Sequence, residues 1–192
     1  MKQKVLWFDT ETTGLDPKKN GMTEIACIVE VDGVVVDEIL LFINTESYSM
    51  DIEYDAYALK ITKKTKEVIF AYPSSSHQFM KFIIFLDKHV HKFDKTDKFI
   101  PAGFNVKFDI DMLQAWFLDN GNKFYGSYFS YKDVDNFALV KFMKYQKMFN
   151  TKDDKLGTIC EYFKIPLDAH NALDDIRATR ELTPKLVSLF KG

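Results

Sequence analysis

The 192-residue sequence contains only two cysteines and no long apolar run. Cys27 and Cys160 both stand among apolar neighbours, so we expect two buried thiols rather than a disulfide or a pair of metal ligands. The amino-terminal stretch MKQKVLWFDTE places four apolar residues in a row before an acid, which is too few for a signal-peptide core. Because no later run reaches the length that crosses a bilayer, we expect a cytoplasmic protein without a membrane partner.

Internal repeats, low-complexity tracts and linkers are also absent from the sequence. With 46% hydrophobic residues the chain is long enough for one core, so we expect a single domain over residues 1–192. The net charge of −2 is not the signature of a polyanion-binding protein. It excludes little, however, because acids that are gathered at one site can be balanced by bound cations.

The hydrophobic pattern predicts strands first, and helices and strands in alternation later. Two strand-like runs meet at Asp32-Gly33, a common hairpin turn, and a third run precedes them. The stretch that follows is irregular, apart from a short helix expected near Lys63. The last helix starts after His170 and contains Pro184, which is expected to kink or divide it. The expected strands cover 4–9, 22–31, 33–43 and 98–105, and the expected helices cover 73–93, 106–121, 135–148, 155–165 and the residues after 170. This order indicates an α/β layered domain with a mixed sheet.

The stretch WFDTETTGLD places two acids, Asp9 and Glu11, directly after an apolar run. Residues two apart on a strand share a face, so both carboxylates can point to one place, which is costly unless a cation or a proton neutralises the pair. The ordinary alternative is a strand that has reached solvent. The pattern also imitates the first half of a calcium-binding loop, but that loop needs Glu at its twelfth position, where this chain has Asn20, and a preceding helix rather than a strand.

Two more acids face inward on predicted helices. In NVKFDID, Asp109 shares its helical face with apolar residues, whereas Asp111 lies among polar ones. In HNALDDIRATRELT, Asp175 likewise lies on the apolar side and Asp174 on the polar side. A helix cap or a buried ion pair would explain either inward acid alone. His170 stands at the start of the last helix, where a histidine is ordinarily a cap or a solvated loop residue.

Taken together, the segments DTETTG, NVKFD and HNALDD resemble, in order and spacing, the three motifs of the DEDDh family of 3′-to-5′ exonucleases. The resemblance extends from Val5 to about Leu189. It implies a ribonuclease H-like three-layer α/β domain, with a mixed five-stranded sheet whose first three strands are antiparallel and with helices on both faces. It also implies two bound Mg²⁺ or Mn²⁺ ions. By the resemblance, the base that activates water is His170, and the metal ligands and catalytic acids are Asp9, Glu11, Asp109 and Asp175.

The resemblance also assigns substrate-binding positions, which are Thr12, Thr13, Gly14, Leu15, Phe104 and Asn105. The first four form the turn after the acids, where the backbone would pass close to the terminal nucleotide and the threonines would lie near the 3′-OH. Ordinary turn chemistry explains the two threonines equally well. The last two stand where related exonucleases often carry a His-Asn pair, so this contact departs from the family pattern.

We therefore expect an exonuclease that hydrolyses phosphodiester bonds at the 3′ ends of single-stranded DNA, or of frayed duplex, and releases nucleoside 5′-monophosphates by a two-metal-ion mechanism. RNA 3′-end trimming stays open as an alternative, because the contacts that sense a 2′-OH cannot be located. A catalytically silent nucleic-acid-binding module is a third alternative, which predicts the loss of a ligand or of the histidine, and all five are present. If the four acids bind metal, the formal charge of the rest of the chain rises from −2 to +2, which suits a polyanion.

Two further features bear on partners. No tail follows Gly192 in this sequence, so we expect no polymerase-anchoring extension and a free-standing or phage-type nuclease. The segment NKFYGSYFSYK interleaves lysines with five aromatic residues, a mixture that can stack unpaired bases, although packing in the core is the ordinary explanation. The expected partner is a single-stranded 3′ end, of DNA rather than RNA.

Overall fold

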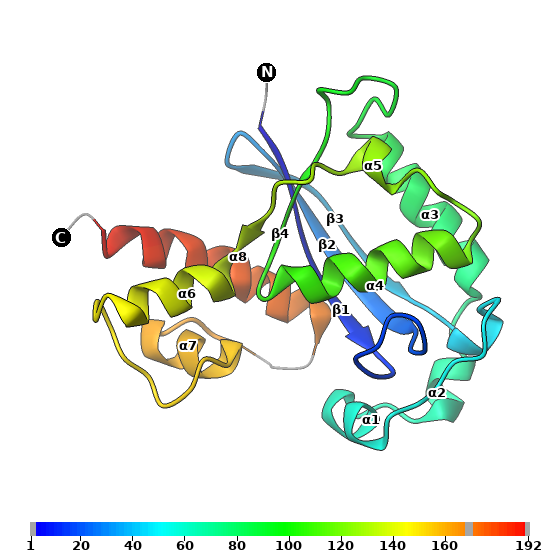
Figure 1. Ribbon diagram of the computed structural model, residues 1–192, viewed down its shortest axis with the longest axis horizontal. Coiled ribbons are helices and arrows are strands. Elements are labelled where there is room, and N and C mark those ends of the chain that lie inside the picture. The colour runs from blue at the N-terminus through cyan, green and yellow to red at the C-terminus, as the bar shows by residue number, and fades with distance from the viewer. Residues whose placement is uncertain (1–2, 168–170, 191–192) are drawn as a thin grey trace.

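Five strands form one mixed sheet within residues 3–167 and 171–190, the parts of the chain that this computed structural model describes (Figure 1). They are β1 Lys4–Thr12, β2 Met22–Val31, β3 Val34–Phe42, β4 Ile100–Gly103 and β5 Val134–Asp135. The order across the sheet is β3-β2-β1-β4-β5, with β1 in the centre. The first three strands pair antiparallel, whereas β4 runs parallel to β1 and β5 parallel to β4. This confirms the predicted sheet.

The turn between β2 and β3 is the predicted hairpin. Asp32 and Gly33 both adopt left-handed backbone angles, with φ of 50° and 83°. A type I′ hairpin turn has positive φ at both central positions, its twist matches that of the strands, and Asp-Gly pairs tolerate it. The turn therefore fixes the register in which Val31 faces Val34.

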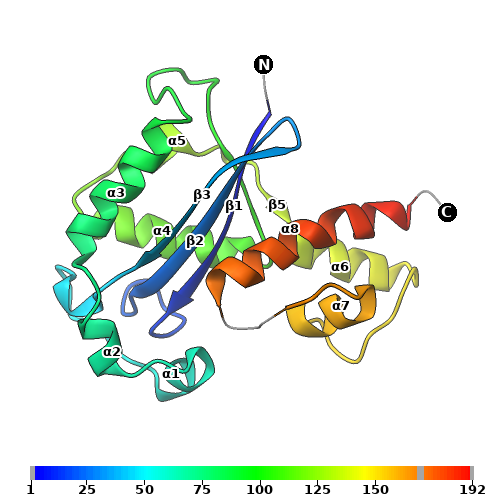
Figure 2. The same ribbon diagram turned by 180° about the vertical axis from the view of Figure 1, so that it is seen from behind.

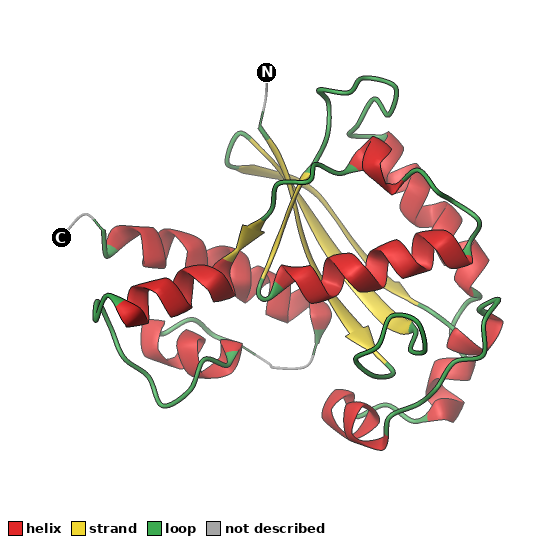
Figure 3. Ribbon diagram, viewed as in Figure 1, coloured by secondary structure: helices red, strands yellow, loops and turns green. Residues whose placement is uncertain are grey.

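Helices cover both faces of the sheet, so the domain has three layers (Figure 3). One face carries α3 and α4, with α5 beyond them, and the other carries α8, with α6 and α7 packed beside it (Figure 2). Two short helices, α1 and α2, follow the sheet's antiparallel part. The helices are α1 Ala56–Thr62, α2 Lys66–Phe70, α3 Ser75–Asp87, α4 Val106–Asp119, α5 Tyr125–Tyr128, α6 Asn136–Tyr145, α7 Leu156–Phe163 and α8 Ala172–Ser188, with a 3₁₀ turn at Thr45–Ser47.

The side chains of β1 alternate between the two helical layers. Leu6 and Phe8 are buried in the large cluster that includes Trp116 of α4, whereas Val5 and Trp7 are buried in the cluster that includes the first turns of α8. This alternation follows from the two-residue period of a strand. The next odd-numbered positions of β1 therefore lie on the α8 face, at the end of the strand.

Several local predictions can be compared with the structure. Both cysteines, Cys27 and Cys160, are buried free thiols, as predicted. The stretch near Lys63 forms two short helices rather than one. The last helix is not divided at Pro184, because α8 continues through that residue to Ser188. In the described part of the chain, no helix combines the length and the apolar character that crossing a membrane requires.

Candidate functional site

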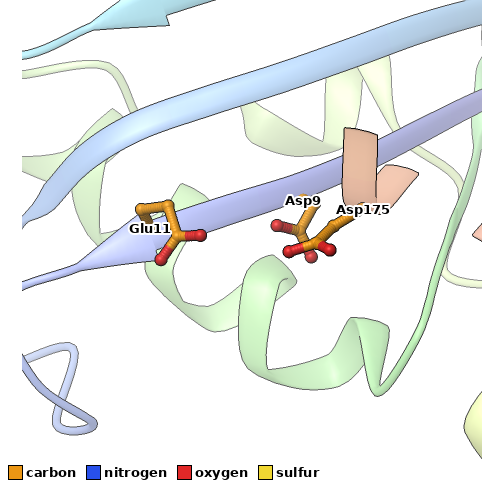
Figure 4. A group of neighbouring side chains, drawn as sticks. All are labelled: Asp9, Glu11 and Asp175. Carbon is orange, nitrogen blue, oxygen red and sulfur yellow. The ribbon is translucent and has the colours of Figure 1, made fainter. Parts of the chain in front are cut away.

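Three carboxylates meet where β1 ends and α8 begins (Figure 4). One oxygen from each of Asp9, Glu11 and Asp175 lies within 4.8 Å of the other two. Asp9 and Glu11 are two residues apart on β1, so they share the face that packs against α8. Asp175 lies in the first turn of that helix. The structure thus brings together three of the four acids that the motifs single out.

The start of α8 decides which of its two acids reaches the site. Asn171 caps the helix, because its side chain accepts hydrogen bonds from the amides of Leu173 and Asp174. The Asp174 carboxylate lies 3.9 Å from the Arg177 guanidinium, one turn further along the helix. Asp175 lies instead beside the acids of β1. Helical periodicity predicts the same member of the pair.

Asp109 reaches the site from α4, on the opposite face of the sheet. Only 3% of its surface is exposed, and its Oδ1 accepts hydrogen bonds from the amide of Thr10, at 3.0 Å, and from the Thr10 hydroxyl, at 2.7 Å. It does not belong to the group of three, but after burial its charge is the largest cause of the raised pKa of Asp9. Asp111 instead pairs with Lys107 on the outer side of α4.

Burial and mutual repulsion raise the pKa values of these acids. Burial raises the pKa of Glu11 to about 7, although Lys64 lowers it in part. Burial also raises the pKa of Asp109 to about 7, despite hydrogen bonds, those from Thr10 above all, that favour its charged form. Burial and then the charges of Asp109 and Asp175 hold the pKa of Asp9 well above its usual range. Carboxylates in such a cluster are stabilised by protons or cations, and oxygen donors suit Mg²⁺ and Mn²⁺, so the donor set fits the divalent ions that the motifs imply.

A buried ion pair beside the acids could not be found from the motifs. Glu24 lies opposite Glu11 in the β1–β2 register, and its carboxylate pairs with Lys64, which follows α1. The Glu24 and Lys64 side chains are only 5% and 10% exposed. The other Glu24 oxygen accepts a hydrogen bond of 3.3 Å from the backbone amide of Ala172, at the start of α8. The one signal in the sequence is an acid inside the apolar run MTEIACIVEV.

The two threonines of the turn are bonded within the protein. The Thr12 hydroxyl donates to the carbonyl of Gly14 at 2.7 Å. The fully buried Thr13 hydroxyl donates to the carbonyl of Glu53 at 2.8 Å and accepts the amide of Gly21 at 3.1 Å. These bonds are the turn chemistry that was the alternative to substrate binding. The Thr13 side chain therefore holds the turn against Glu53 and Gly21.

Gly14 is required by a close side-chain approach. A Cβ atom at this position would stand 2.6 Å from the carboxamide of Asn20, whose atoms are themselves hydrogen-bonded to Asp16 and Glu53. The next residue, Leu15, is 80% exposed. Of the four predicted positions in this turn, Leu15 is the one whose side chain projects into solvent, where a ligand could reach it.

Phe104 and Asn105 lie at the start of α4. Phe104 is half-buried and packs against Phe137, with 5.5 Å between the ring centroids. Asn105 is exposed and adopts a left-handed conformation, with φ of 63°, which asparagine tolerates better than most residues. The backbone amide of Asn105 donates a hydrogen bond to the carboxylate of Asp135 at 2.8 Å, so the backbone here is held by β5.

His170, the predicted base, lies outside the described residues, which resume at Asn171. Its assignment comes from the HNALDD motif.

The central aromatic residues of segment 122–132 pack in the core. Tyr125 and Phe129 stack on each other with 4.4 Å between their ring centroids, and both lie against Phe117 of α4. Phe124 and Tyr131 are exposed. The packing explanation therefore accounts for the central residues of this segment.

The sequence as a whole matches a known family. Residues 6–183 match the RNase_T family, described as exonuclease. This chain belongs to that family. The matched residues include both acids of β1 and the part of α8 that carries Asp175.

Similar proteins include large polymerases and smaller nucleases. PolC-type DNA polymerase III of Thermotoga petrophila is 27% identical over 185 residues, which are 96% of this chain and 12% of the polymerase, and that of Clostridium perfringens is 24% identical over 91% of this chain and 10% of the polymerase. The chain thus spans only about a tenth of these relatives.

Solved structures of Exonuclease I have the same fold. The E. coli enzyme in complex with a dT13 oligonucleotide superposes with a TM-score of 0.76 at 17% identity, over 97% of this chain and 43% of the other. A moderately thermophilic Exonuclease I from Methylocaldum szegediense gives 0.74 at 20% identity, over 96% and 40%. The ribonuclease H-like exonuclease fold implied by the motifs is therefore confirmed.

Proposed function

We propose that this protein is a metal-dependent 3′-to-5′ exonuclease that removes nucleoside 5′-monophosphates from single-stranded DNA ends. The observation that carries the proposal is the convergence of Asp9, Glu11 and Asp175 in a chain of an exonuclease family. Such a cluster is stabilised by cations. Phosphodiester hydrolysis is a reaction that paired divalent ions promote.

In this proposal, two Mg²⁺ or Mn²⁺ ions are held by Asp9, Glu11, Asp109 and Asp175. Asp9 has the central place, because all three other carboxylates contribute to its raised pKa. Thr10 keeps the Asp109 carboxylate turned toward β1 through two hydrogen bonds on one oxygen. When bound, such ions acidify the attacking water and balance charge on the attacking and leaving oxygens.

His170 is the general base of the proposed reaction and takes a proton from the attacking water. A histidine suits this task because its ordinary pKa is close to neutral pH. It directly precedes Asn171, the residue that caps α8. Asp175, a proposed metal ligand, lies in the first turn of the same helix.

Single-stranded DNA is the proposed substrate for two reasons. The similar polymerases are DNA polymerases, and several of the similar Exonuclease I structures hold a DNA oligonucleotide such as dT13 or dA16. RNA trimming uses the same chemistry and differs in the sugar of the substrate. Both substrates therefore belong in the experiment that tests the proposal.

The test uses 5′-labelled and 3′-labelled DNA and RNA oligonucleotides with Mg²⁺, Mn²⁺ or EDTA, resolved on one gel. A descending ladder from 5′-labelled DNA, early release of a mononucleotide from 3′-labelled DNA and no cleavage in EDTA are expected. Ladders from RNA alone would move the substrate to RNA. Binding without cleavage in either metal would contradict the enzymatic proposal.

Two neighbouring residues of α8 provide a matched control for contaminating nucleases. Asp175→Asn removes a proposed metal ligand and should abolish cleavage. Asp174→Asn makes the same chemical change one residue away, at an acid that lies near Arg177 rather than in the cluster, and should keep activity within about twofold. Equal activity of the two variants would mean that the cluster is not the catalytic centre.

A further inference from the structure

A cavity of about 520 Å³ opens beside the acidic cluster on the side of α7. Asp175 forms part of its wall, so the cavity begins at the proposed catalytic centre. The remainder of its lining comes from α7 and the segments that flank it, and includes Lys152, Lys155, Leu156 and Leu167. Figure 2 shows α7 next to α8, which carries Asp175.

Two lysines of this cavity are candidates for binding an anion. Lys152 and Lys155 are both exposed, and neither forms an ion pair with an acid of the described chain. Lys144, on α6, differs from them because it is tied to Asp154 and to two backbone carbonyls. Asp153 lies between the two lysines in sequence. Hydrogen bonds from Thr158 and from the backbone amide of Lys155 lower the pKa of its carboxyl group, and the charges of Lys155 and Lys152 contribute less. The two ammonium groups are thus available to an anion.

The charge of the surrounding segment is opposite to that of the whole chain. Residues 136–167 contain six lysines and three acids, whereas the formal net charge of the protein is −2. Although the cavity wall also includes Glu161, the net positive charge of residues 136–167 favours a polyanion on this side of the acidic cluster.

We propose that this cavity is the binding site for the strand upstream of the scissile bond, with Lys152 and Lys155 bound to backbone phosphates on the 5′ side of the terminal nucleotide. The proposal rests on the exonuclease function proposed above. The scissile phosphate must lie at the carboxylates. The nucleotides on its 5′ side must therefore leave the site along a surface that adjoins those carboxylates. Leu156 and Leu167 supply apolar surface for sugars or bases, and the lysines supply the phosphate contacts.

The experiment compares two substrates of one protein. The first is a 5′-labelled oligothymidylate, which has upstream phosphates, and the second is the p-nitrophenyl ester of thymidine 5′-monophosphate, which has none. In the Lys152→Gln/Lys155→Gln double variant, the ratio of kcat/KM for the oligonucleotide to kcat/KM for the ester should fall at least about 10-fold, through KM. Because each phosphate contact on a single strand contributes about 0.7 to the salt dependence, the slope of log kcat/KM against log salt for the oligonucleotide should become shallower by about 1.4.

Lys164→Gln is the matched control, because Lys164 follows the other end of α7, is exposed and does not line the cavity. It should leave the substrate ratio and the salt slope unchanged. An unchanged ratio and slope in the double variant, with the ester still hydrolysed, would overturn the upstream site while leaving the exonuclease proposal in place. An equal loss on both substrates would also overturn it, since the lysines would then act on the catalytic centre. Failure of the unmodified protein to hydrolyse either substrate would overturn both proposals.

Discussion

Thr10 and Asp109 are joined by two hydrogen bonds that cross from the central strand to a helix, and both bonds end on the same carboxylate oxygen. The residues are 99 positions apart in the chain. Thr10 lies between two acids of β1 but points to the opposite face, so it meets α4 where Asp109 is buried. This contact fixes the fourth carboxylate and links the α4 layer to the strand that carries Asp9 and Glu11.

Thr10→Val should lower the free energy of unfolding by about 1–3 kcal/mol, because it keeps the shape of the side chain but leaves a buried carboxylate with one partner fewer. Urea denaturation measures the change. Thr96→Val removes a similar hydroxyl bond, to Asp94 at 2.7 Å, from an exposed loop and should cost less than about 0.5 kcal/mol. Equal losses in both variants would show that the buried contact has no special weight.

The metal-free protein should lose stability as the pH rises. The pKa values of Glu11 and Asp109 are raised in the folded state to about 7, from ordinary values near 4, so the unfolded chain releases these protons first. The stability that protonation provides is present below about pH 4 and is lost progressively up to about pH 7. Thermal melting in EDTA between pH 4 and pH 8 should therefore show a falling Tm over this window.

Divalent ions should reverse that loss. At pH 8, Mn²⁺ should raise Tm in a concentration-dependent way because it binds the folded state. Asp9→Asn should flatten the pH dependence in EDTA and abolish the rise with Mn²⁺, since it removes the carboxylate that the other three surround. An unchanged Mn²⁺ affinity of Asp9→Asn in calorimetry would contradict the central place of Asp9.

The pair of Lys64 and Glu24 should be strongly coupled. Lys64→Met leaves a nearly buried carboxylate unpaired beside other acids and should cost about 3 kcal/mol. Adding Glu24→Gln should recover most of this loss, because glutamine keeps an acceptor for the Ala172 amide and carries no charge. Lys19→Met, which breaks an exposed pair with Glu53, is the control and should change stability by less than about 1 kcal/mol. Additive effects of the two buried substitutions would refute the coupling.

His170→Ala should cut turnover at least about 100-fold and leave metal binding largely intact, because a general base contributes to rate without holding the ions. Single-turnover cleavage at saturating Mn²⁺ measures the rate, and calorimetry measures Mn²⁺ affinity. His77→Ala, on the exposed surface of α3, is the control and should behave as the unmodified protein. Near-normal turnover of His170→Ala in a preparation free of other nucleases would remove the general-base assignment.

The sequence predicts which side chains share one face of a strand or helix, because this depends only on the repeat of that element. Asp9 and Glu11 share a face because a strand repeats every two residues. Asp109 was preferred to its neighbour two positions on, and it is buried, because a helix repeats every 3.6 residues. The Asp32-Gly33 hairpin was predictable for another local reason, because an Asp-Gly pair tolerates the positive φ angles of the turn.

Partners that meet through packing of the layers were decided only by the tertiary structure. The bonds from Thr10 to Asp109, and the pair of Glu24 with Lys64, join elements that are distant in sequence, and no local period records them. The sequence leaves open whether the Thr13 hydroxyl faces substrate or the protein. In the structure it donates a hydrogen bond to the carbonyl of Glu53. The sequence by itself determined which acids face inward, whereas the packing of helices on both faces of the sheet determined which groups hold those acids in place.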